Sequence, residues 1–346
     1  MNATRRDVAD RAGVSTAVVS YVVNNGPGKV AAATRARVEA AIRDLDYRPN
    51  VMARALKGGV TGTVGLLLPS PSNPFFAELS EAIQRVLVDS GKVALIGVSG
   101  GATRRVEQYL ELFAERRADG LIVASDRALE NGLKSHDVGI RVVSVDRPLE
   151  SIAASTVLLD NESAAEHAVA HLQDHGHTVI GCVAGPPGTL PTSRRVAGWR
   201  RTQSEAGNPA GDDLVAHGEF TEVGGEIAAH ALLGRERRAG AADRPRPTAL
   251  FVSSDIQAIG VMHACEALGL GVPDDVAIVS VDGTRIGEYA RPSLTSLRQP
   301  VDEIAATAVD ELLFGTGATR HELSGNLFIG SSCGCGSASA QGAVSV

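Results

Sequence analysis

The sequence predicts an α/β protein in which a small all-α head precedes a large two-lobed body built on parallel sheets. Three observations support this prediction. Basic residues are concentrated in residues 1–60, the same stretch has helical spacing, and apolar strand-like runs alternate with helical patterns beyond it. Such alternation is typical of parallel α/β layers. The chain has 346 residues, which suits two or three domains at roughly 100 to 200 residues each.

Composition is that of an ordinary globular chain, with 44% hydrophobic and 21% charged residues. No apolar run approaches the roughly 18 residues of a transmembrane helix, and the polar stretch from Met1 to Asp10 does not match a signal peptide. The four cysteines fit a reducing compartment in which thiols stay free. We therefore expect a cytosolic protein without a membrane partner.

Charge is unevenly distributed along the chain. Residues 1–60 hold ten Lys or Arg against five Asp or Glu, a surplus of +5, whereas the whole chain carries −7 and the remainder therefore −12. A basic head on an acidic body is expected when only the head meets phosphates. The alternative is a chance cluster of basic residues on a solvated face.

The stretch "AGVSTAVVSYVVNN" has the composition of a strand but the spacing of a helix. Its apolar residues come in runs such as Ala17-Val18-Val19 instead of alternating with polar ones. Ser15 is a natural N-cap for a helix over residues 16–24, and Gly13 suits the turn between it and a preceding helix that starts near Arg5.

A third helix is predicted over residues 31–47, and its apolar face consists of Thr34, Val38, Ala41, Ile42 and Leu45. Pro49 then breaks the chain, and residues 51–57 have the pattern of a short helix that ends at Gly58-Gly59.

The motifs "DVADRAGVS", "VSYVVN", "TRARVEAAI" and "YRPN..AR.L", in this order, resemble the LacI/GalR family of bacterial transcription repressors. The resemblance covers nearly the whole chain up to Cys335. It implies a helix-turn-helix DNA-binding domain at 1–49, a hinge helix and linker at 50–60, and an effector-binding and dimerisation domain at 61–335. Residues 336–346 are expected to form a disordered low-complexity tail.

The resemblance also implies which residues of the head meet DNA. The helix over 16–24 is similar to the recognition helix in the major groove, so Thr16, Ala17 and Tyr21 would face bases. Tyr21 stands where many members carry arginine, which predicts an altered operator; its alternative role is packing against the third helix. Phosphate-positioning residues would be Ser15, Ser20, Asn24, Thr34 and Arg35.

In the hinge, Leu56 is similar to the family's minor-groove wedge, which both subunits of a dimer insert at the centre of a palindrome. Apolar wedges unstack a base step and kink the duplex. Asn50 and Arg54 flank this position and would meet the DNA backbone. The alternative is that Leu56 covers the core beneath it.

The body shows two similar series of elements. Strands of the first are expected at 63–69, 93–98, 119–125, 141–147 and 156–161, with a helix at 75–91. Strands of the second are expected at 179–185, 214–220, 248–254 and 276–283, with helices at 162–175, 193–206, 222–233 and 255–268. The resemblance implies the type I periplasmic-binding-protein fold. Its first lobe would span about 61–160 and 291–322, and its second about 161–290 and 323–335.

Ligands of open α/β sheets bind beyond the carboxyl ends of the strands. In the family pattern, effector-contacting or pocket-shaping positions match Asp146, Arg195, Phe220, Asp255 and Asp282, and Phe75 and Phe76 would close the opposite wall. Carboxylates with one arginine suit the vicinal hydroxyls of a sugar, and aromatic faces stack on its CH surface. A sugar effector is therefore preferred over a purine. Two departures from the family, Ser254 at a frequent Asn position and Gly283 after Asp282, leave its identity open.

These residues also have structural alternatives. Aspartate at the end of a strand often caps the next helix, which applies to Asp160 and Asp255. Phe75, Phe76 and Phe220 are alternatively core residues.

An enzyme is the first competing class, because residues 97–101 fit the G-x-S-x-G pattern of a hydrolase nucleophile elbow around Ser99. A triad would need an acid and a histidine downstream, and His321 has no motif around it. We expect a glycine-rich strand-to-helix turn instead, and no enzyme activity. No P-loop is present, and no cofactor is expected. A sugar receptor without DNA binding is the second competing class, and the basic head argues against it.

No metal site is expected from the sequence. Cys333-Gly334-Cys335 is a C-x-C without a second ligand pair, and the histidines at 171, 175 and 177 are interpreted as a solvated helix end. The residues and their resemblance to the LacI/GalR family together imply a homodimeric, or alternatively tetrameric, effector-responsive repressor that binds a palindromic operator. A tail-built tetramer is not expected, because no leucine repeat follows the body.

Overall fold

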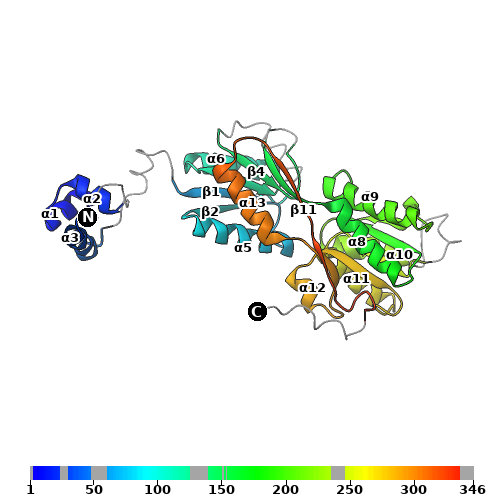
Figure 1. Cartoon of the computed structure of the whole chain (residues 1–346). Coiled ribbons are helices and arrows are strands. Elements are labelled where there is room, and N and C mark those ends of the chain that lie inside the picture. The colour runs from blue at the N-terminus through cyan, green and yellow to red at the C-terminus, as the bar shows by residue number, and fades with distance from the viewer. Residues whose placement is uncertain are drawn as a thin grey trace. The chain divides into compact units, whose positions relative to one another are not determined.

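The protein is described by a computed structural model, in which residues 3–23, 30–47, 61–124, 139–149, 152, 154–234 and 246–335 are placed. The chain divides into two compact units, residues 1–61 and 62–346, and Figure 1 draws both. Each unit is described by itself. Among the placed residues, no helix has the length and apolar character needed to cross a membrane.

The head consists of α1 (Arg5–Ala12), α2 (Thr16–Val23) and α3 (Ala32–Asp44). A capping box begins α1, because the backbone N–H of Thr4 donates to the Asp7 carboxylate at 2.7 Å and the Asp7 N–H donates back to the Thr4 hydroxyl. Gly13 ends α1 at φ 62°, a left-handed conformation that glycine adopts without strain. The Ser15 hydroxyl accepts from the N–H of Val18 at 3.4 Å and caps α2.

The strand-like valines of α2 form its packing face. Val19 and Val22 are buried against Val8 of α1 and Val38 of α3. The other face of α2 is open, since Thr16, Ala17 and Tyr21 are exposed. The prediction of a helix over this stretch is therefore confirmed, and its β-branched composition reflects the small core it fills.

The first lobe of the body contains a parallel six-stranded sheet in the order β11-β5-β4-β3-β1-β2. Helices α5 (Pro74–Asp89) and α13 (Val301–Phe314) cover one face of it, and α6 (Thr103–Glu115) covers the other. The strands are β1 (Thr63–Leu68), β2 (Val93–Val98), β3 (Gly120–Ala124), β4 (Val142–Val145), β5 (Ser155–Leu159) and β11 (Arg320–Leu323).

The second lobe repeats this architecture around a sheet in the order β12-β10-β9-β8-β6-β7, in which only the β10–β12 pairing is antiparallel. Helices α8 (Asn161–Asp174) and α9 (Leu190–Glu205) pack on one face. Helices α10 (Glu222–Leu233) and α11 (Asp255–Ala267) pack on the other. The short helix α12 (Arg285–Tyr289) follows β9, and the 3-10 turn η1 (Asp212–Leu214) precedes β7.

The strands of this second sheet are β6 (Ile180–Ala184), β7 (Val215–His217), β8 (Ala249–Val252), β9 (Ala277–Asp282), β10 (Thr295–Arg298) and β12 (Asn326–Phe328). Each lobe is thus a sheet with helices on both faces, as Figure 1 shows.

The chain passes from the first lobe to the second after β5, returns before α13, and passes again between β11 and β12. One expected boundary is wrong. The resemblance predicts the return near residue 291, but β10 pairs with β9 along residues 295–298, so the chain leaves the second lobe only after Arg298. The apolar run "SLTSL" gave no sign of which sheet it joins, because pairing partners are set by tertiary packing.

Helices α10 and α11 approach so closely that glycine is required at their contact. A Cβ at Gly260 would overlap the carbonyl oxygen of Glu222, and one at Gly225 would overlap the carbonyl oxygen of Gln257. Both obstacles are backbone atoms, which cannot move aside as a side-chain end would.

We therefore expect Gly260→Ala to lower the free energy of unfolding by about 3 kcal/mol, the upper range for overpacked cores. Chemical denaturation of the full chain measures this. Gly317→Ala is the matched control, because no atom lies within 4 Å of a Cβ there, and it should change stability by less than about 1 kcal/mol. Equal effects of the two substitutions would contradict the close packing of α10 on α11.

Candidate functional site

The head presents a small uncharged surface on α2. Thr16 and Ala17 are exposed, and Tyr21 has 46% of its surface exposed, so it is not a core residue of the head. Ser15 caps α2, while Ser20, Thr34 and Arg35 are partly exposed nearby on α2 and α3. The remaining predicted DNA contacts, Asn24, Asn50, Arg54 and Leu56, lie outside the described residues.

A cleft of about 770 Å³ lies between the two lobes of the body. Its first-lobe wall comes from Pro69, Ser70, Asn73, Phe76, Gly100, Gly101 and Arg147, and its second-lobe wall from Pro186, Pro187, Thr189, Glu219, Phe220 and Thr221. The volume is in the range of small-molecule sites, roughly 300–1,000 Å³.

A second, narrower pocket of about 20 Å³ shares Asn73, Phe76, Arg147 and Phe220 with the cleft. It is further lined by Phe75, Asp146, Pro191, Arg195, Ser254, Asp282 and Gln299. Most of these residues follow strands at their carboxyl ends, as the fold class predicts. Of the eight predicted effector residues, this pocket brings together seven.

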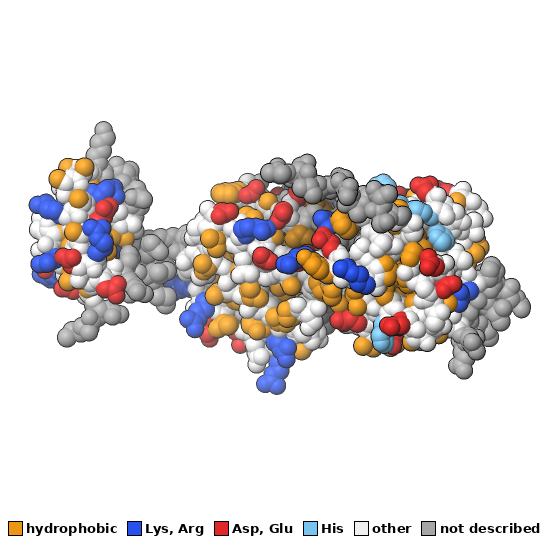
Figure 2. Space-filling view, turned by 90° about the horizontal axis from the view of Figure 1, so that it is seen from below, with side chains coloured by type: hydrophobic (Ala, Val, Ile, Leu, Met, Phe, Trp, Pro, Cys, Tyr) orange, Lys and Arg blue, Asp and Glu red, His pale blue; other side chains and the backbone are white. Residues whose placement is uncertain are grey.

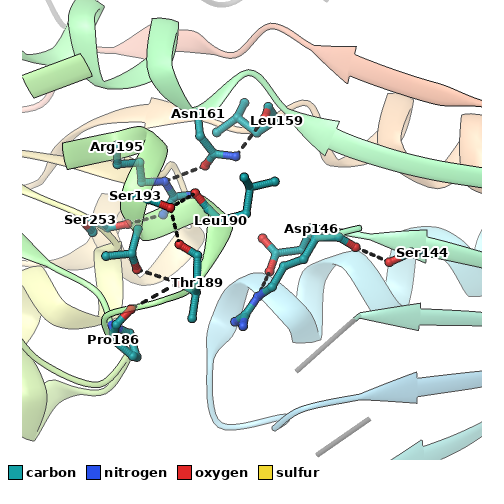
Figure 3. A network of polar contacts seen from close by, with 12 residues as sticks. Ser144, Asp146, Leu159, Asn161, Pro186, Thr189, Leu190, Ser193, Arg195 and Ser253 are labelled. Carbon is teal, nitrogen blue, oxygen red and sulfur yellow. Dashed lines mark hydrogen bonds and ion pairs between the residues drawn. The ribbon is translucent and has the colours of Figure 1, made fainter. Parts of the chain in front are cut away.

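Arg195 is the buried cation of this pocket, with 3% of its surface exposed. It lies in the second turn of α9. Its Nε donates to the Asn161 side-chain oxygen at 2.8 Å and its Nη1 donates to the Ser253 carbonyl. Asn161 begins α8 directly after the chain enters the second lobe, and Figure 3 shows it beside Arg195. The guanidinium is therefore fixed in place by partners of its own lobe.

Asp146 faces this cation from the first lobe, as Figure 3 shows. It follows β4 in a left-handed conformation at φ 70°, and its carboxylate accepts from Arg147 Nε at 3.3 Å. Asp146 and Arg147 both line the narrow pocket. A ligand there would meet charged groups from both lobes.

Asp282, at the end of β9, is the second carboxylate of the pocket. It is 4% exposed and accepts from the Gln299 amide at 2.9 Å. Burial raises its pKa to about 8, although the nearby charge of Arg195 acts in the opposite direction. Gln299 was not predicted, because the chain was expected to return to the first lobe near residue 291. Its position directly after β10 is the sequence feature that would have indicated it.

Asp255, which the family pattern predicts to be an effector residue, does not line either pocket. Its carboxylate accepts from the hydroxyls of Ser280, Ser296 and Thr284 and from the Thr284 N–H, at 2.6–2.7 Å. It therefore fixes the loop after β9 instead of contacting the cleft. It is not the cap of α11 either, because Ser254 accepts from the Gln257 N–H at 3.3 Å.

Of the other structural alternatives, Asp160 caps α8 through the N–H of Ser163 at 3.2 Å. Phe75 and Phe76 are both core and pocket residues, since they are buried among apolar side chains of the first lobe and also line the narrow pocket. Phe220 lies over Gly185, where an added Cβ would overlap its ring.

Outside the cleft, the structure brings two cysteines and two histidines of the second lobe together. Cys333 and Cys335 lie against His171 and His175 of α8, with one ligand atom of each residue within 4.8 Å of the others. The two histidines come from more than 150 positions earlier in the chain, so the sequence around the C-x-C motif does not indicate that they lie beside it.

Comparisons with known proteins bear on both units. Residues 4–50 match the family described as bacterial regulatory proteins, lacI family, and residues 169–333 match a periplasmic binding protein-like domain. The HTH-type transcriptional repressor PurR of Vibrio parahaemolyticus is 33% identical over 92% of this chain and 94% of its own length. The chain belongs to the lacI family. The ribose operon repressor of Escherichia coli is also 33% identical, over 90% of this chain and 92% of its own length.

Solved structures agree with this family assignment. The transcriptional regulator CelR in complex with cellobiose is 29% identical, covers 95% of this chain and 99% of its own, and superposes with a TM-score of 0.68. The Lac repressor dimer bound to operator and the anti-inducer ONPF, at 24% identity, covers 96% of this chain and 99% of its own with a TM-score of 0.81, and shows the same fold.

Membership of the lacI family decides between the competing classes. Its members are transcription regulators and not enzymes, so the prediction of a DNA-binding regulator is confirmed and a hydrolase is excluded. Ser99 is accordingly a strand-end residue, 1% exposed, whose N–H donates to the Leu68 carbonyl at 2.9 Å.

The raised pKa of Asp282 predicts how stability depends on pH. Between about pH 4 and 8 the unfolded chain ionises this carboxyl, while the folded protein keeps it protonated. The unfolded state therefore binds fewer protons, and the free energy of unfolding should fall as pH rises through this window.

Asp282→Asn should remove this contribution, so that the variant's unfolding free energy falls less steeply between pH 5 and 8 than that of the wild type. Urea unfolding at several pH values measures the two slopes. Asp302→Asn is the control, because that carboxylate is 87% exposed, and its slope should match the wild type. An unchanged slope in Asp282→Asn would contradict a buried neutral carboxyl.

Proposed function

We propose that this regulator acts as a homodimeric repressor that binds a palindromic operator in double-stranded DNA. A small polyhydroxylated effector, a sugar or sugar derivative rather than a purine, binds in the cleft and changes operator affinity. The observation that carries the proposal is the lining of the cleft by both lobes. A ligand that contacts both lobes has different affinities for different lobe arrangements, and only such a difference can shift the equilibrium between them.

The chemistry of the pocket favours hydroxyl groups. The carboxylate of Asp146 accepts hydrogen bonds, the guanidinium of Arg195 donates them, and the Asp282 carboxyl does either according to its protonation. Phe76 and Phe220 offer aromatic faces to the CH surface of a ring. The narrow pocket of about 20 Å³ has room for roughly one water-sized group, such as a single hydroxyl. The wider cleft would hold the rest of a mono- or disaccharide. The related CelR is known in complex with cellobiose.

In the head, Thr16, Ala17 and Tyr21 are proposed to face base edges in the major groove. Thr and Ala side chains contact the thymine methyl group, and Tyr21 cannot make the bidentate guanine contact of an arginine. Ser15, Ser20, Asn24, Thr34 and Arg35 are proposed to position phosphates. Leu56, flanked by Asn50 and Arg54, would enter the minor groove.

The dimer is proposed to form through the first lobe. Val88 at the end of α5 and Val93 and Ile96 of β2 are 62%, 53% and 44% exposed, and β2 is an edge strand. Figure 2 shows hydrophobic side chains gathered on the surface of this lobe. An edge strand with exposed apolar neighbours is stabilised when a second copy covers it.

The effector is identified by titrating the full-length protein with sugars and with nucleobases, using isothermal calorimetry and thermal shift. We expect a sugar to bind and raise the melting temperature. Asp146→Asn, which keeps the side-chain size, should lower the affinity for that sugar about tenfold to a hundredfold, because hydrogen bonds to charged groups contribute about 1.5–3 kcal/mol. Asp302→Asn, which changes an exposed carboxylate of α13 that lines neither pocket, should leave affinity unchanged. Binding of nucleobases but no sugar would overturn the effector class.

Operator recognition is tested by comparing two substitutions in the head. Tyr21→Ala should change the preferred base at one position of each half-site selected from random DNA, with little change in the salt dependence of binding. Arg35→Ala should weaken binding to all DNA sequences by the same factor and reduce the slope of log affinity against log salt concentration by about 0.9. Fluorescence anisotropy at several salt concentrations measures both. An identical base preference in Tyr21→Ala would contradict its proposed role.

A further inference from the structure

The second lobe contains a compact cluster of two thiols and two imidazoles, His171, His175, Cys333 and Cys335. The Cys335 Sγ lies 3.1 Å from His175 Nε2 and 3.6 Å from His171 Nε2. The two imidazole rings are 4.8 Å apart at their centroids and meet edge to face. None of these four side chains lines the cleft or the narrow pocket.

Local structure explains why the four residues converge. His171 and His175 are four positions apart at the end of α8, so their side chains project from the same helical face. Between the cysteines, Gly334 adopts φ +88°, a conformation that a side-chain-bearing residue would rarely take. The backbone can therefore reverse within one residue, which lets both sulfurs approach α8.

The strands of the second lobe hold the cysteine end of the cluster in place. The Thr295 hydroxyl of β10 donates to Cys333 Sγ at 2.9 Å, and the Thr295 N–H donates to the Ser332 hydroxyl, also at 2.9 Å. The Ser332 hydroxyl in turn donates to the Ile278 carbonyl of β9 at 2.7 Å. Cys333 is 1% exposed and belongs to the core of the lobe. Both halves of the cluster thus rest on rigid elements.

We propose that His171, His175, Cys333 and Cys335 bind one Zn²⁺ ion in a structural Cys₂His₂ site. Tetrahedral zinc at about 2.3 Å from sulfur and about 2.0 Å from nitrogen places its ligand atoms roughly 3.3–3.8 Å from one another. The two distances at Cys335 already lie at or near that range, and all four ligand atoms lie within 4.8 Å. Zinc binding therefore requires the ligand atoms to move by about 1 Å or less.

The ligand set selects the metal. Two thiolates with two imidazoles in a tetrahedral arrangement suit zinc, whereas Mg²⁺ and Ca²⁺ prefer oxygen ligands. Four protein ligands also leave no open coordination position, which is the mark of a structural rather than a catalytic site. The Thr295 hydroxyl supplies the outer hydrogen bond to a ligand that such sites use to orient it. His175 is exposed, which gives the ion a path from solvent.

The site would fasten the end of the body to its second lobe. Residues 329–335 follow the last strand of that lobe, and the zinc would tie them to the carboxyl end of α8. The amino end of the same helix carries Asn161, which positions Arg195 in the cleft. Zinc would therefore stabilise the lobe that supplies the buried cation of the effector site, without touching the effector.

The experiment uses the reduced full-length protein, freed of metal by a chelator and titrated with Zn²⁺ or Co²⁺. We expect one ion per chain, visible absorption of tetrahedral Co²⁺ with thiolate charge-transfer bands, and a higher melting temperature with zinc. Zinc should also protect Cys335 from alkylation at least tenfold. His175→Ala and Cys335→Ser, both at the accessible side of the cluster, should each weaken zinc binding at least a hundredfold.

Two matched controls come from neighbouring residues outside the cluster. His177→Ala removes a histidine two positions from His175, and Cys265→Ser removes a buried thiol of the same lobe; both should bind zinc as the wild type does. The proposal is overturned if His175→Ala and Cys335→Ser keep wild-type affinity. It is equally overturned if the folded, reduced wild-type protein binds no zinc, or if the cobalt spectrum lacks thiolate bands.

Discussion

The proposed effector site depends on how the buried guanidinium of Arg195 is held in place. Removing this cation from water is costly unless hydrogen bonds and opposite charges replace the lost hydration. Asn161 at the start of α8 and the Ser253 carbonyl at the end of β8 satisfy two of its donors. Asp146 supplies opposite charge, and the Asp282 carboxyl would add to it only once it ionises above about pH 8. The arrangement ties α8, α9, β8 and β9 to one point, so the second lobe presents a fixed donor to the cleft.

The two neighbouring carboxyls of the second lobe, those of Asp255 and Asp282, have different roles near this cation. Asp255 is saturated by three hydroxyls and one backbone N–H of its own lobe, which fixes the loop that follows β9. Asp282 has one side-chain donor, Gln299, and its other oxygen receives only the long contact from the Asp255 N–H at 3.4 Å. Burial keeps the pKa of Asp282 high. Asp282 therefore has capacity left for a ligand, whereas Asp255 does not.

Sequence patterns predicted the two-unit architecture, the helix at α2 and most of the narrow pocket, because strand ends and helix caps are local features. They did not separate Asp255 from Asp282, since both follow apolar strands and only packing decides which one faces the pocket. Gln299 was missed because tertiary packing, and not the local sequence, decides which strand β10 pairs with. The approach of His171 to Cys333 was missed for the same reason: no local pattern relates residues more than 150 positions apart.

The places where the chain changes lobes connect this network to the proposed switch. Asp160 and Asn161 stand at the first crossing, and Gln299 stands at the second. Asn161 holds Arg195, and Gln299 holds Asp282. Any rotation of one lobe against the other must be absorbed by the backbone at these crossings, which positions the groups that contact the effector. A ligand that bridges Arg195 and Asp146, as proposed for the effector, would therefore be sensitive to the angle between the lobes.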